Sequence, residues 1–381
     1  MFEDALPILA VLCLNIAASE WLVRKTALRH LGAALLVIVL TAITANLGLI
    51  PTVDGETPHP VYDTIFAQVA PLGIFWLLLQ VRLSGLAKVG RPLLVLFLLG
   101  SLGTVAGVIC GMLVVDGATA FGTDYNVLGG MFVGTYTGGS ANFLAVAEGF
   151  EFRRGTLFLG AVAADSAMTT VWMAINVAVP RLLDRRWPDR SKSSDASLNA
   201  PITGESEDTE AVHPMDVALL IAVGALSLWA SRQLESMTGV PYILILTTLA
   251  LVLGQTPIAR VLKGSRMLGM FAVMIFLAVI GALCDVGALI ELEALGLQLS
   301  LFVVVVVLVH GLIVYGAAAL FRIDAVTASI ASQANIGGGT SALALARSLG
   351  RANLVLPAIL IGSLGTALGT YLGFMTASWL L

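Results

Sequence analysis

Charged side chains are scarce in this chain, and their scarcity excludes most soluble folds. Asp, Glu, Lys and Arg make up 12% of the 381 residues, about half the share that is typical of soluble domains. Apolar residues make up 58%, and the mean hydropathy is +0.96. The net charge is only −4 and no basic stripe is present, so we expect no nucleic-acid partner.

The usual signatures of catalysis and of ATP-driven transport are also missing. The sequence has no HExxH, no GxSxG, no Walker loop and no paired Cys or His ligands. Its three cysteines, Cys13, Cys110 and Cys284, lie in separate apolar segments without metal or redox spacing. We interpret them as small core residues, and we expect that the protein is not an enzyme.

Long apolar runs, by contrast, recur along nearly the whole chain. About 20 residues of such a run cross a bilayer as a helix, and the runs lack the alternating pattern of barrel strands. The sequence therefore predicts an all-α, multi-pass protein of the lipid bilayer. The expected segments are 5–23, 31–50, 63–81, 92–115, 126–148, 156–180, 215–232, 241–257, 266–285, 298–320, 325–346 and 353–380.

One polar stretch divides the chain into two halves of similar size. From Asp184 to Glu210 the sequence is rich in Ser, Asp and Glu and has no apolar face, as expected of a solvated linker. We therefore predict a first membrane repeat at 1–180, a cytoplasmic linker at 181–214 and a second membrane repeat at 215–381.

The placement of Lys and Arg orients the two repeats. Basic residues follow the first and third runs of the first repeat but the second run of the second repeat, at Arg260, Lys263 and Arg266. By the positive-inside rule the second repeat is inverted relative to the first. An outside N-terminus and a cytoplasmic linker do not fit six crossings, so either one orientation signal misleads or one segment per repeat is re-entrant. The N-terminus is not transit-like, and we expect a bacterial inner (plasma) membrane protein.

Two glycine-rich motifs occupy the same place in each repeat. The first, at 134–148, reads GTYTGGSANFLAVAE, and the second, at 333–347, reads QANIGGGTSALALAR. Paired glycines weaken a helix by about 1 kcal/mol per residue relative to Ala, so each motif predicts a broken or re-entrant helix. The aligned positions are Gly138, Gly139 and Ser140 in the first motif and Gly338, Gly339 and Thr340 in the second.

A broken helix inside a membrane indicates a binding site. Freed backbone groups are tolerated at that depth only where they face a cavity, a ligand or other protein, and the helix beginning after the break favours an anionic group. The alternative is that these glycines only permit close packing. The predicted solute-binding residues are Thr135, Thr137, Gly138, Gly139, Ser140, Asn142, Asn335, Gly338, Gly339, Thr340 and Ser341.

Packing is the interpretation we favour for two other glycine series. Gly100, Gly103, Gly107 and Gly111 recur at helical spacing in one segment, and Gly362, Gly365, Gly369 and Gly373 in another. Small residues at such spacing let helices approach closely in membranes.

Asp165 lies deep in an apolar segment, within AVAADSAMTT. An ionisable residue at this depth is costly and indicates a functional site, although an ion pair or hydrogen bond that fixes packing is the alternative. It is suited to coordinate Na⁺ or to carry a proton. His310, in a valine-rich run, is interpreted as a packed histidine, with a proton carrier as the alternative. The predicted cation ligands are Asp165, Thr169, Asn142, Asn335 and Thr340.

The segments GTYTGGSANFLAVAE, AADSAMTTVWM and ASQANIGGGTSALALARS resemble the DUF819 family of bacterial and plastid membrane proteins. The resemblance extends over essentially the whole chain. That family is similar to the broad superfamily of bile-acid symporters, glutamate symporters and sodium/proton antiporters. The resemblance implies inverted repeats, a core domain with broken helices, a scaffold domain that often dimerises, and elevator-type alternating access.

Carried over to this chain, the resemblance places Gly138 to Asn142 and Asn335 to Thr340 at the two helix breaks. It also places Asp165 where related antiporters have an ion-binding acid. Those antiporters commonly have an adjacent polar or acidic residue, whereas this chain has Ala164. The departure disfavours pure proton exchange.

The function predicted first is a Na⁺-coupled symporter of a small anionic or zwitterionic organic solute, acting as a homodimer by an elevator mechanism. A Na⁺/H⁺ antiporter that uses Asp165 is the second hypothesis. A membrane scaffold or sensor that transports nothing is the third, but it leaves the paired motifs unexplained.

Overall fold

The computed structural model describes residues 4–26, 32–52, 59–83, 85–152, 155–183, 212–257, 259, 262–283 and 291–380, and these residues form helices and connecting turns without strands. The predicted linker from Asp184 to Glu210 and Cys284 lie outside the described residues. The all-α prediction is confirmed for the part of the chain that is described.

In the first half the helices follow the predicted apolar segments closely. They are α1 (Ala5–Lys25), α2 (Gly32–Asn46), α3 (Pro60–Thr64), η2 (Ile65–Val69), α4 (Ala70–Leu78), η3 (Leu86–Lys88), α5 (Arg91–Val115), α6 (Gly117–Phe121), η4 (Gly122–Asp124), α7 (Tyr125–Gly138), α8 (Ser140–Gly149) and α9 (Gly155–Leu183). Helices α3, η2 and α4 run on without a gap.

The second half has the same order of long and broken helices. Its elements are α10 (Pro214–Thr238), α11 (Tyr242–Gly254), α13 (Ser265–Ala282), α14 (Glu291–Phe321), α15 (Ala325–Ile336), α16 (Gly338–Ser348) and α17 (Ala352–Trp379). Among the described residues, eight helical stretches are long and apolar enough to cross a membrane. The predicted segments 126–148 and 325–346 are each divided in two, into α7 and α8 and into α15 and α16.

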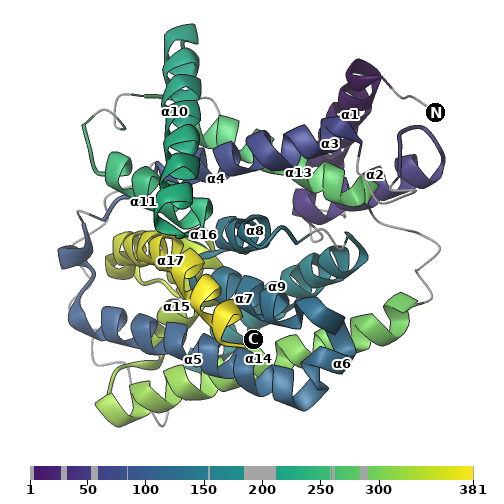
Figure 1. Cartoon of the computed structure of the whole chain (residues 1–381). Helices are drawn as coiled ribbons and strands as arrows, with labels where there is room; N and C mark the ends of the chain where they lie inside the picture. Colours follow the sequence, from purple (N-terminus) through teal and green to yellow (C-terminus); the bar gives the residue numbers. More distant parts are fainter. Residues whose placement is uncertain are drawn as a thin grey trace.

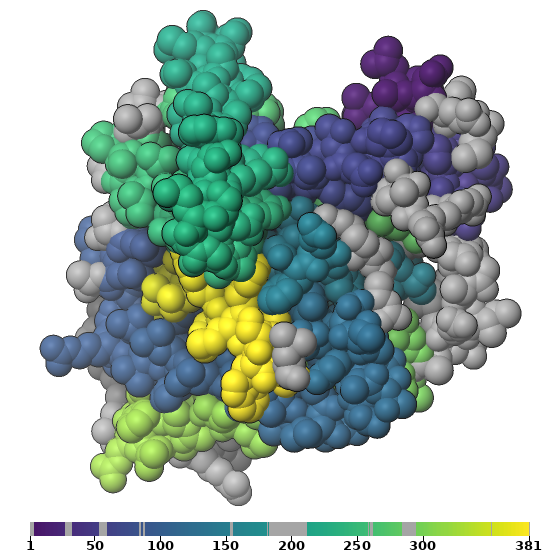
Figure 2. All heavy atoms as spheres, viewed as in Figure 1, coloured from purple at the N-terminus to yellow at the C-terminus, as the bar shows by residue number. Residues whose placement is uncertain are grey.

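The helices form two groups, which Figure 1 shows in the upper and lower parts of the molecule. We call α5, α7, α8, α9, α14, α15, α16 and α17 the hairpin group, and α1, α2, α3, α4, α10, α11 and α13 the flanking group. Within the hairpin group α5 lies along α14, and α17 lies along α7. Within the flanking group α13 packs on α2 and α4. Figure 2 shows α1 and α10 projecting from the flanking group at either end of a row formed by α3 and α4.

Contacts between the helices recur in pairs across the two halves. Helix α1 packs on α2 as α10 packs on α11, and α2 packs on α13 as α11 packs on α4. In the hairpin group α5 contacts α7 as α14 contacts α15, and α9 contacts α15 as α17 contacts α7. Each of these helices therefore has a counterpart in the other half with matching neighbours.

The glycine series on α5 faces α14. A methyl group built on Gly107 would lie 2.6 Å from the carbonyl oxygen of Val306, and one built on Gly111 would lie 2.7 Å from the ring of Phe302. Only glycine lets the two long helices approach this closely. The packing interpretation of this series is confirmed.

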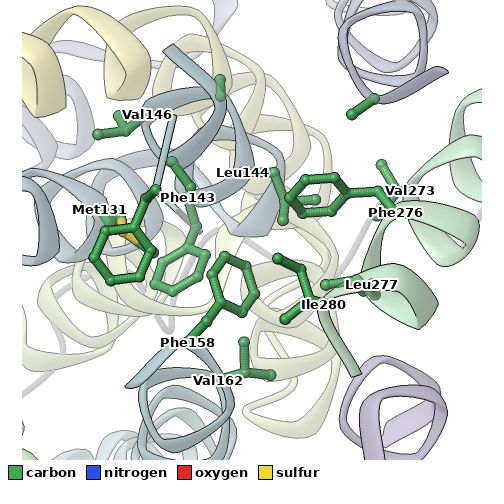
Figure 3. Close-up of a cluster of buried hydrophobic side chains, with 14 of the residues drawn as sticks. Met131, Phe143, Leu144, Val146, Phe158, Val162, Val273, Phe276, Leu277 and Ile280 are labelled. Carbon is green, nitrogen blue, oxygen red and sulfur yellow. The ribbon is translucent and has the colours of Figure 1, made fainter. Parts of the chain in front are cut away.

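Apolar side chains fill the part of the boundary between the two groups that lies around α8, α9 and α13 (Figure 3). The ring of Phe158 on α9 lies 5.3 Å from that of Phe143 on α8 and 6.0 Å from that of Phe276 on α13, measured between centroids. At α11 two hydrogen bonds cross the boundary: the Tyr242 hydroxyl donates to Glu148 on α8, and the Thr248 hydroxyl lies 2.7 Å from the Tyr371 hydroxyl on α17.

Candidate functional site

The first glycine motif folds into a helical hairpin. Helix α7 ends at Gly138, α8 begins at Ser140, and Gly139 between them has φ +95°, a conformation that glycine adopts without strain. Past this turn the chain doubles back, because the rings of Phe132 and Phe143 lie 5.9 Å apart. The α7–α8 pair is the first hairpin, and the predicted break is confirmed.

The second motif folds in the same way. Helix α15 ends at Ile336, α16 begins at Gly338, and Gly338 has φ +74°. The Gln333 amide on α15 donates to Ser341 Oγ on α16 at 3.1 Å. This bond joins two residues that lie on opposite arms of the second hairpin, α15–α16. In the alignment of the two motifs Gly338 corresponds to Gly138. The glycine with positive φ therefore comes one position earlier in the second hairpin than in the first, where it is Gly139.

The tips of both hairpins pack on the same turn of α17. The backbone of Gly138 lies directly against that of Gly365, and a methyl group built on Gly339 would lie 3.3 Å from Cα of Gly362. The Thr366 hydroxyl also donates to the Gly138 carbonyl at 3.1 Å. Since residues three apart lie on one face of a helix, Gly362 and Gly365 bring the two tips together. The second glycine series is thus a packing surface too: Gly362 and Gly365 face the two tips, and Gly369 and Gly373 face the arms of the first hairpin.

The N-terminal ends of α8 and α16 are open at these tips. Neither helix has a side chain that caps its first turn, and Ser140 and Thr340 are both exposed. No other part of the described protein lies within 4 Å of a methyl group built on Gly139 or Gly338. The exposed backbone N–H groups of a helix start attract anions, so two such ends on one turn of α17 are suited to a carboxylate or phosphate.

Behind the first tip lies a buried acid without a partner. Asp165 on α9 lies beside the side chains of Thr135 and Tyr136 on α7. Oδ1 of Asp165 and the hydroxyl of Tyr136 are both buried, and neither has a hydrogen bond of normal geometry in the protein, although the two side chains are direct neighbours. Among the described residues Asp165 forms no ion pair. A carboxylate in this position requires a bound cation or a proton to offset the loss of hydration.

Two more side chains of the first hairpin are buried with polar atoms unused. The Thr370 hydroxyl donates to Asn142 Oδ1 at 2.8 Å, which ties α8 to α17. The Asn142 amide nitrogen and the Thr137 hydroxyl have no partner in the protein. Buried polar atoms are almost always hydrogen-bonded, so their gathering around one hairpin is unusual.

In the second hairpin the buried polar groups are joined into a network. The Asn176 amide on α9 donates to Gln333 Oε1 at 2.9 Å, and the Tyr315 hydroxyl donates to Asn176 Oδ1 at 2.6 Å. Ser329 is 2.8 Å from the same hydroxyl. Through Gln333 and Ser341 the network reaches the tip, where the Ser341 hydroxyl donates to the Gly338 carbonyl at 3.0 Å.

His310 on α14 connects α5 to the second hairpin. Its Nδ1 lies 2.9 Å from the Gly100 carbonyl, and because a carbonyl only accepts, Nδ1 carries the proton. Nε2 then accepts from the Ser332 hydroxyl at 3.0 Å. Both ring nitrogens of this buried histidine are used by the protein, which favours the packed histidine over a proton carrier.

Comparison with known proteins agrees with the helical membrane fold. The family model described as "Protein of unknown function (DUF819)" matches residues 9–381. This chain belongs to the DUF819 family. An "Uncharacterized membrane protein YjcL" from Bacillus subtilis (strain 168) is 29% identical to it, over 91% of this chain and 89% of the relative. The resemblance to DUF819 that the motifs indicate is therefore confirmed.

In this DUF819 protein the predicted site residues divide into three sets. Thr135, Thr137 and Asn142 lie buried around the first hairpin, and Ser140 and Thr340 lie exposed at the two tips. The Asn335 amide is directed away, toward α5. With its nitrogen facing the carbonyls of Phe97 and Ala331 it donates to both, and its oxygen accepts from Ser101.

The five predicted cation ligands stay a prediction as a set. Asp165 has Thr135 and Tyr136 of α7 as neighbours, and the polar atoms of Asn335 are used by Phe97, Ala331 and Ser101. Within the described ranges no three His, Cys, Asp or Glu residues cluster. Sequence reasoning missed Tyr136, a neighbour of Asp165 whose hydroxyl has no hydrogen bond of normal geometry. The signal was a tyrosine two residues before a helix break, inside an apolar segment.

Proposed function

We propose that this protein is a secondary active transporter. The observation that carries the proposal is the meeting of two glycine hairpin tips on one turn of α17. A soluble ligand held there would contact both halves of the chain at once. Broken helices that place helix ends at a common point near the membrane midplane are typical of secondary transporters.

The two halves act as inverted repeats in this proposal. The recurring pairs of helix contacts support a repeat, as do the two glycine motifs. The opposite charge patterns of the halves support the inversion. With both hairpins re-entrant, each repeat has an odd number of crossings, which reconciles an outside N-terminus with a cytoplasmic linker in the plasma membrane.

The hairpin group would move as a body against the flanking group, as an elevator does. The apolar contacts around Phe158 and Phe276 support this, because apolar contacts can be exchanged for others without leaving polar groups unpaired. Both tips and Asp165 belong to the hairpin group, so solute and ion would travel together.

The transported solute would be a small organic anion or zwitterion, coupled to Na⁺. The uncapped starts of α8 and α16 suit the negative group of the solute. Asp165 suits a cation. Ion binding would favour the loaded, mobile core, because a ligand shifts a conformational equilibrium only through a difference in affinity between its states.

The test is transport by the purified protein in liposomes. A pool of amino acids and carboxylic acids is added under an inward Na⁺ gradient, with Asp165→Asn as the inactive control. Na⁺ uptake that depends on solute supports the symporter. Na⁺-driven pH change without solute supports the antiporter, which the unpaired Asp165 also permits. If the folded protein gives neither signal, the proposal is overturned for the solutes in the pool.

A further inference from the structure

Two orphaned oxygens lie side by side in the interior of the hairpin group. They are Oδ1 of Asp165 and the hydroxyl of Tyr136, and the side chain of Tyr136 is fully buried. A buried hydroxyl without a partner costs about 1–3 kcal/mol, and a buried carboxylate costs more. A cation bound between the two would satisfy both atoms.

We propose that Asp165, Tyr136 and Thr135 supply the ligands of a sodium site between α9 and α7. The inference rests on the proposed function and deepens it, since it assigns the coupling ion to the first hairpin alone. Asn335 and Thr340 of the second hairpin take no part in it.

The chemistry of the three side chains fits a small monovalent cation. They offer a carboxylate, a phenolic hydroxyl and an alcohol, all hard oxygen donors, with no nitrogen or sulfur ligand among them. One carboxylate supplies one negative charge, which a single Na⁺ neutralises. No basic side chain of the described chain pairs with Asp165, so no resident positive charge competes with the ion.

The position of Tyr136 connects this site to the tip. It stands two residues before Gly138, with φ −85° and ψ +15°, outside the helical range of its neighbours. Its carbonyl accepts from the Thr104 hydroxyl at 3.0 Å, so the backbone is held on α5 while the phenol reaches toward Asp165. An ion that orders this phenol orders the last turn of α7 before the tip.

The chain contains a matched control for Tyr136. Tyr315 is a second tyrosine of the hairpin group, but its hydroxyl is bonded to Asn176 and Ser329. Tyr136→Phe removes a hydroxyl without a partner, whereas Tyr315→Phe removes one with two. The two variants should therefore differ both in stability and in sodium binding.

The experiment measures the apparent melting temperature of the purified full chain in detergent, as NaCl replaces choline chloride at constant ionic strength. Sodium that binds the folded state raises the melting temperature of the wild type. Tyr136→Phe should leave the melting temperature in choline chloride unchanged or higher. It should raise the Na⁺ concentration that gives half of the maximal stabilisation about tenfold or more. Tyr315→Phe should lower the melting temperature in choline chloride and leave the stabilisation by sodium intact. Asp165→Asn should abolish the response.

Two results would overturn the site, and they differ in what they leave standing. A sodium response that is lost in Asp165→Asn but equals the wild type in both Tyr136→Phe and Thr135→Val rejects these ligands, while sodium coupling through Asp165 survives. If sodium does not stabilise the folded wild type, both the site and the sodium part of the proposed function are rejected. Thr135→Val also serves where Tyr136→Phe does not fold, and a weakened response in that variant supports the site.

Discussion

The two hairpins have the same construction but differ in how their buried polar groups are satisfied. In the second hairpin Gln333, Asn176 and Tyr315 form a continuous chain of hydrogen bonds. Around the first, Tyr136, Thr137, Asn142 and Asp165 each have a buried polar atom without a partner. The two hairpins therefore share a fold but differ in their hydrogen bonding. The second is held by a completed network, whereas the first retains donors and acceptors that the protein does not use.

The difference has a physical basis in the cost of burying polar atoms. A satisfied network fixes side chains and contributes stability, whereas unpaired groups lower stability unless a ligand completes them. The ion-pair contact at the base of the second hairpin adds to its support, because Arg351 lies 3.6 Å from Asp324, which caps α15. We infer that ligand binding affects the first hairpin more than the second.

The largest effect is expected at the contact between the first tip and α17. In Gly138→Ala the new methyl group would overlap the Gly365 backbone. We expect a loss of at least about 1–3 kcal/mol, seen as a lower melting temperature and loss of a monodisperse peak in size-exclusion chromatography.

The control is Gly316→Ala on α14, where no atom lies within 4 Å of the new methyl group. This helix-interior change should stabilise the protein by up to about 1 kcal/mol. Equal stability of the two variants would mean that the first tip does not pack on α17.

Next in size is the removal of the centre of the second network. Asn176→Leu leaves Gln333 Oε1 without its donor and the Tyr315 hydroxyl without one of its partners. We expect a loss of about 1–3 kcal/mol and faster hydrogen exchange in the residues around the second tip.

Asn15→Leu provides the matched comparison in the flanking group. Asn15 joins α1 to α2 through Thr41 and Thr44, so its loss should lower stability by a similar amount. Exchange at the second tip should not change in that variant. Faster exchange there in both variants would argue against a local role for Asn176.

A smaller effect is expected for one hydroxyl of the second hairpin. Ser341→Ala removes the acceptor of the Gln333 amide and the donor to the Gly338 carbonyl. The expected loss is about 0.5–1.5 kcal/mol, measured by thermal unfolding in detergent. Unchanged stability would show that the tip is held without this bond.

The smallest effect is expected for the corresponding change in the first hairpin. Thr137→Val also removes one buried hydroxyl, but that hydroxyl has no partner in the protein. Stability in the absence of ligand should stay the same or rise slightly, because an unpaired polar group is replaced by an apolar one of similar shape. A loss as large as that of Ser341→Ala would contradict the contrast between the hairpins.

Local patterns in the sequence predicted most of the fold. Apolar length placed several spans within a few residues of the observed helices, as for α5 and α17. The glycine motifs placed both breaks, because the loss of helix propensity is a property of the residue itself. The α5 series predicted close helix packing for the same reason.

The site was harder to predict, because its contacts join residues far apart in the chain. Asn176 and Gln333 are 157 positions apart, and Thr370 and Asn142 are 228 apart. No local pattern reveals that Asn335 is directed toward α5, or that Tyr136 rather than Asn335 is the neighbour of Asp165. The sodium ligands and the solute stay predictions, and so do the elevator motion and the dimer.

The single turn of α17 between Gly362 and Gly365 has one more consequence. Both tips rest on it, so a small rotation or slide of this helix displaces both of them together. In the proposed transporter, occupancy at one hairpin would then change the affinity of the other without direct contact, and by linkage the effect would be reciprocal. One short stretch of helix would thereby couple two segments that lie far apart in the sequence.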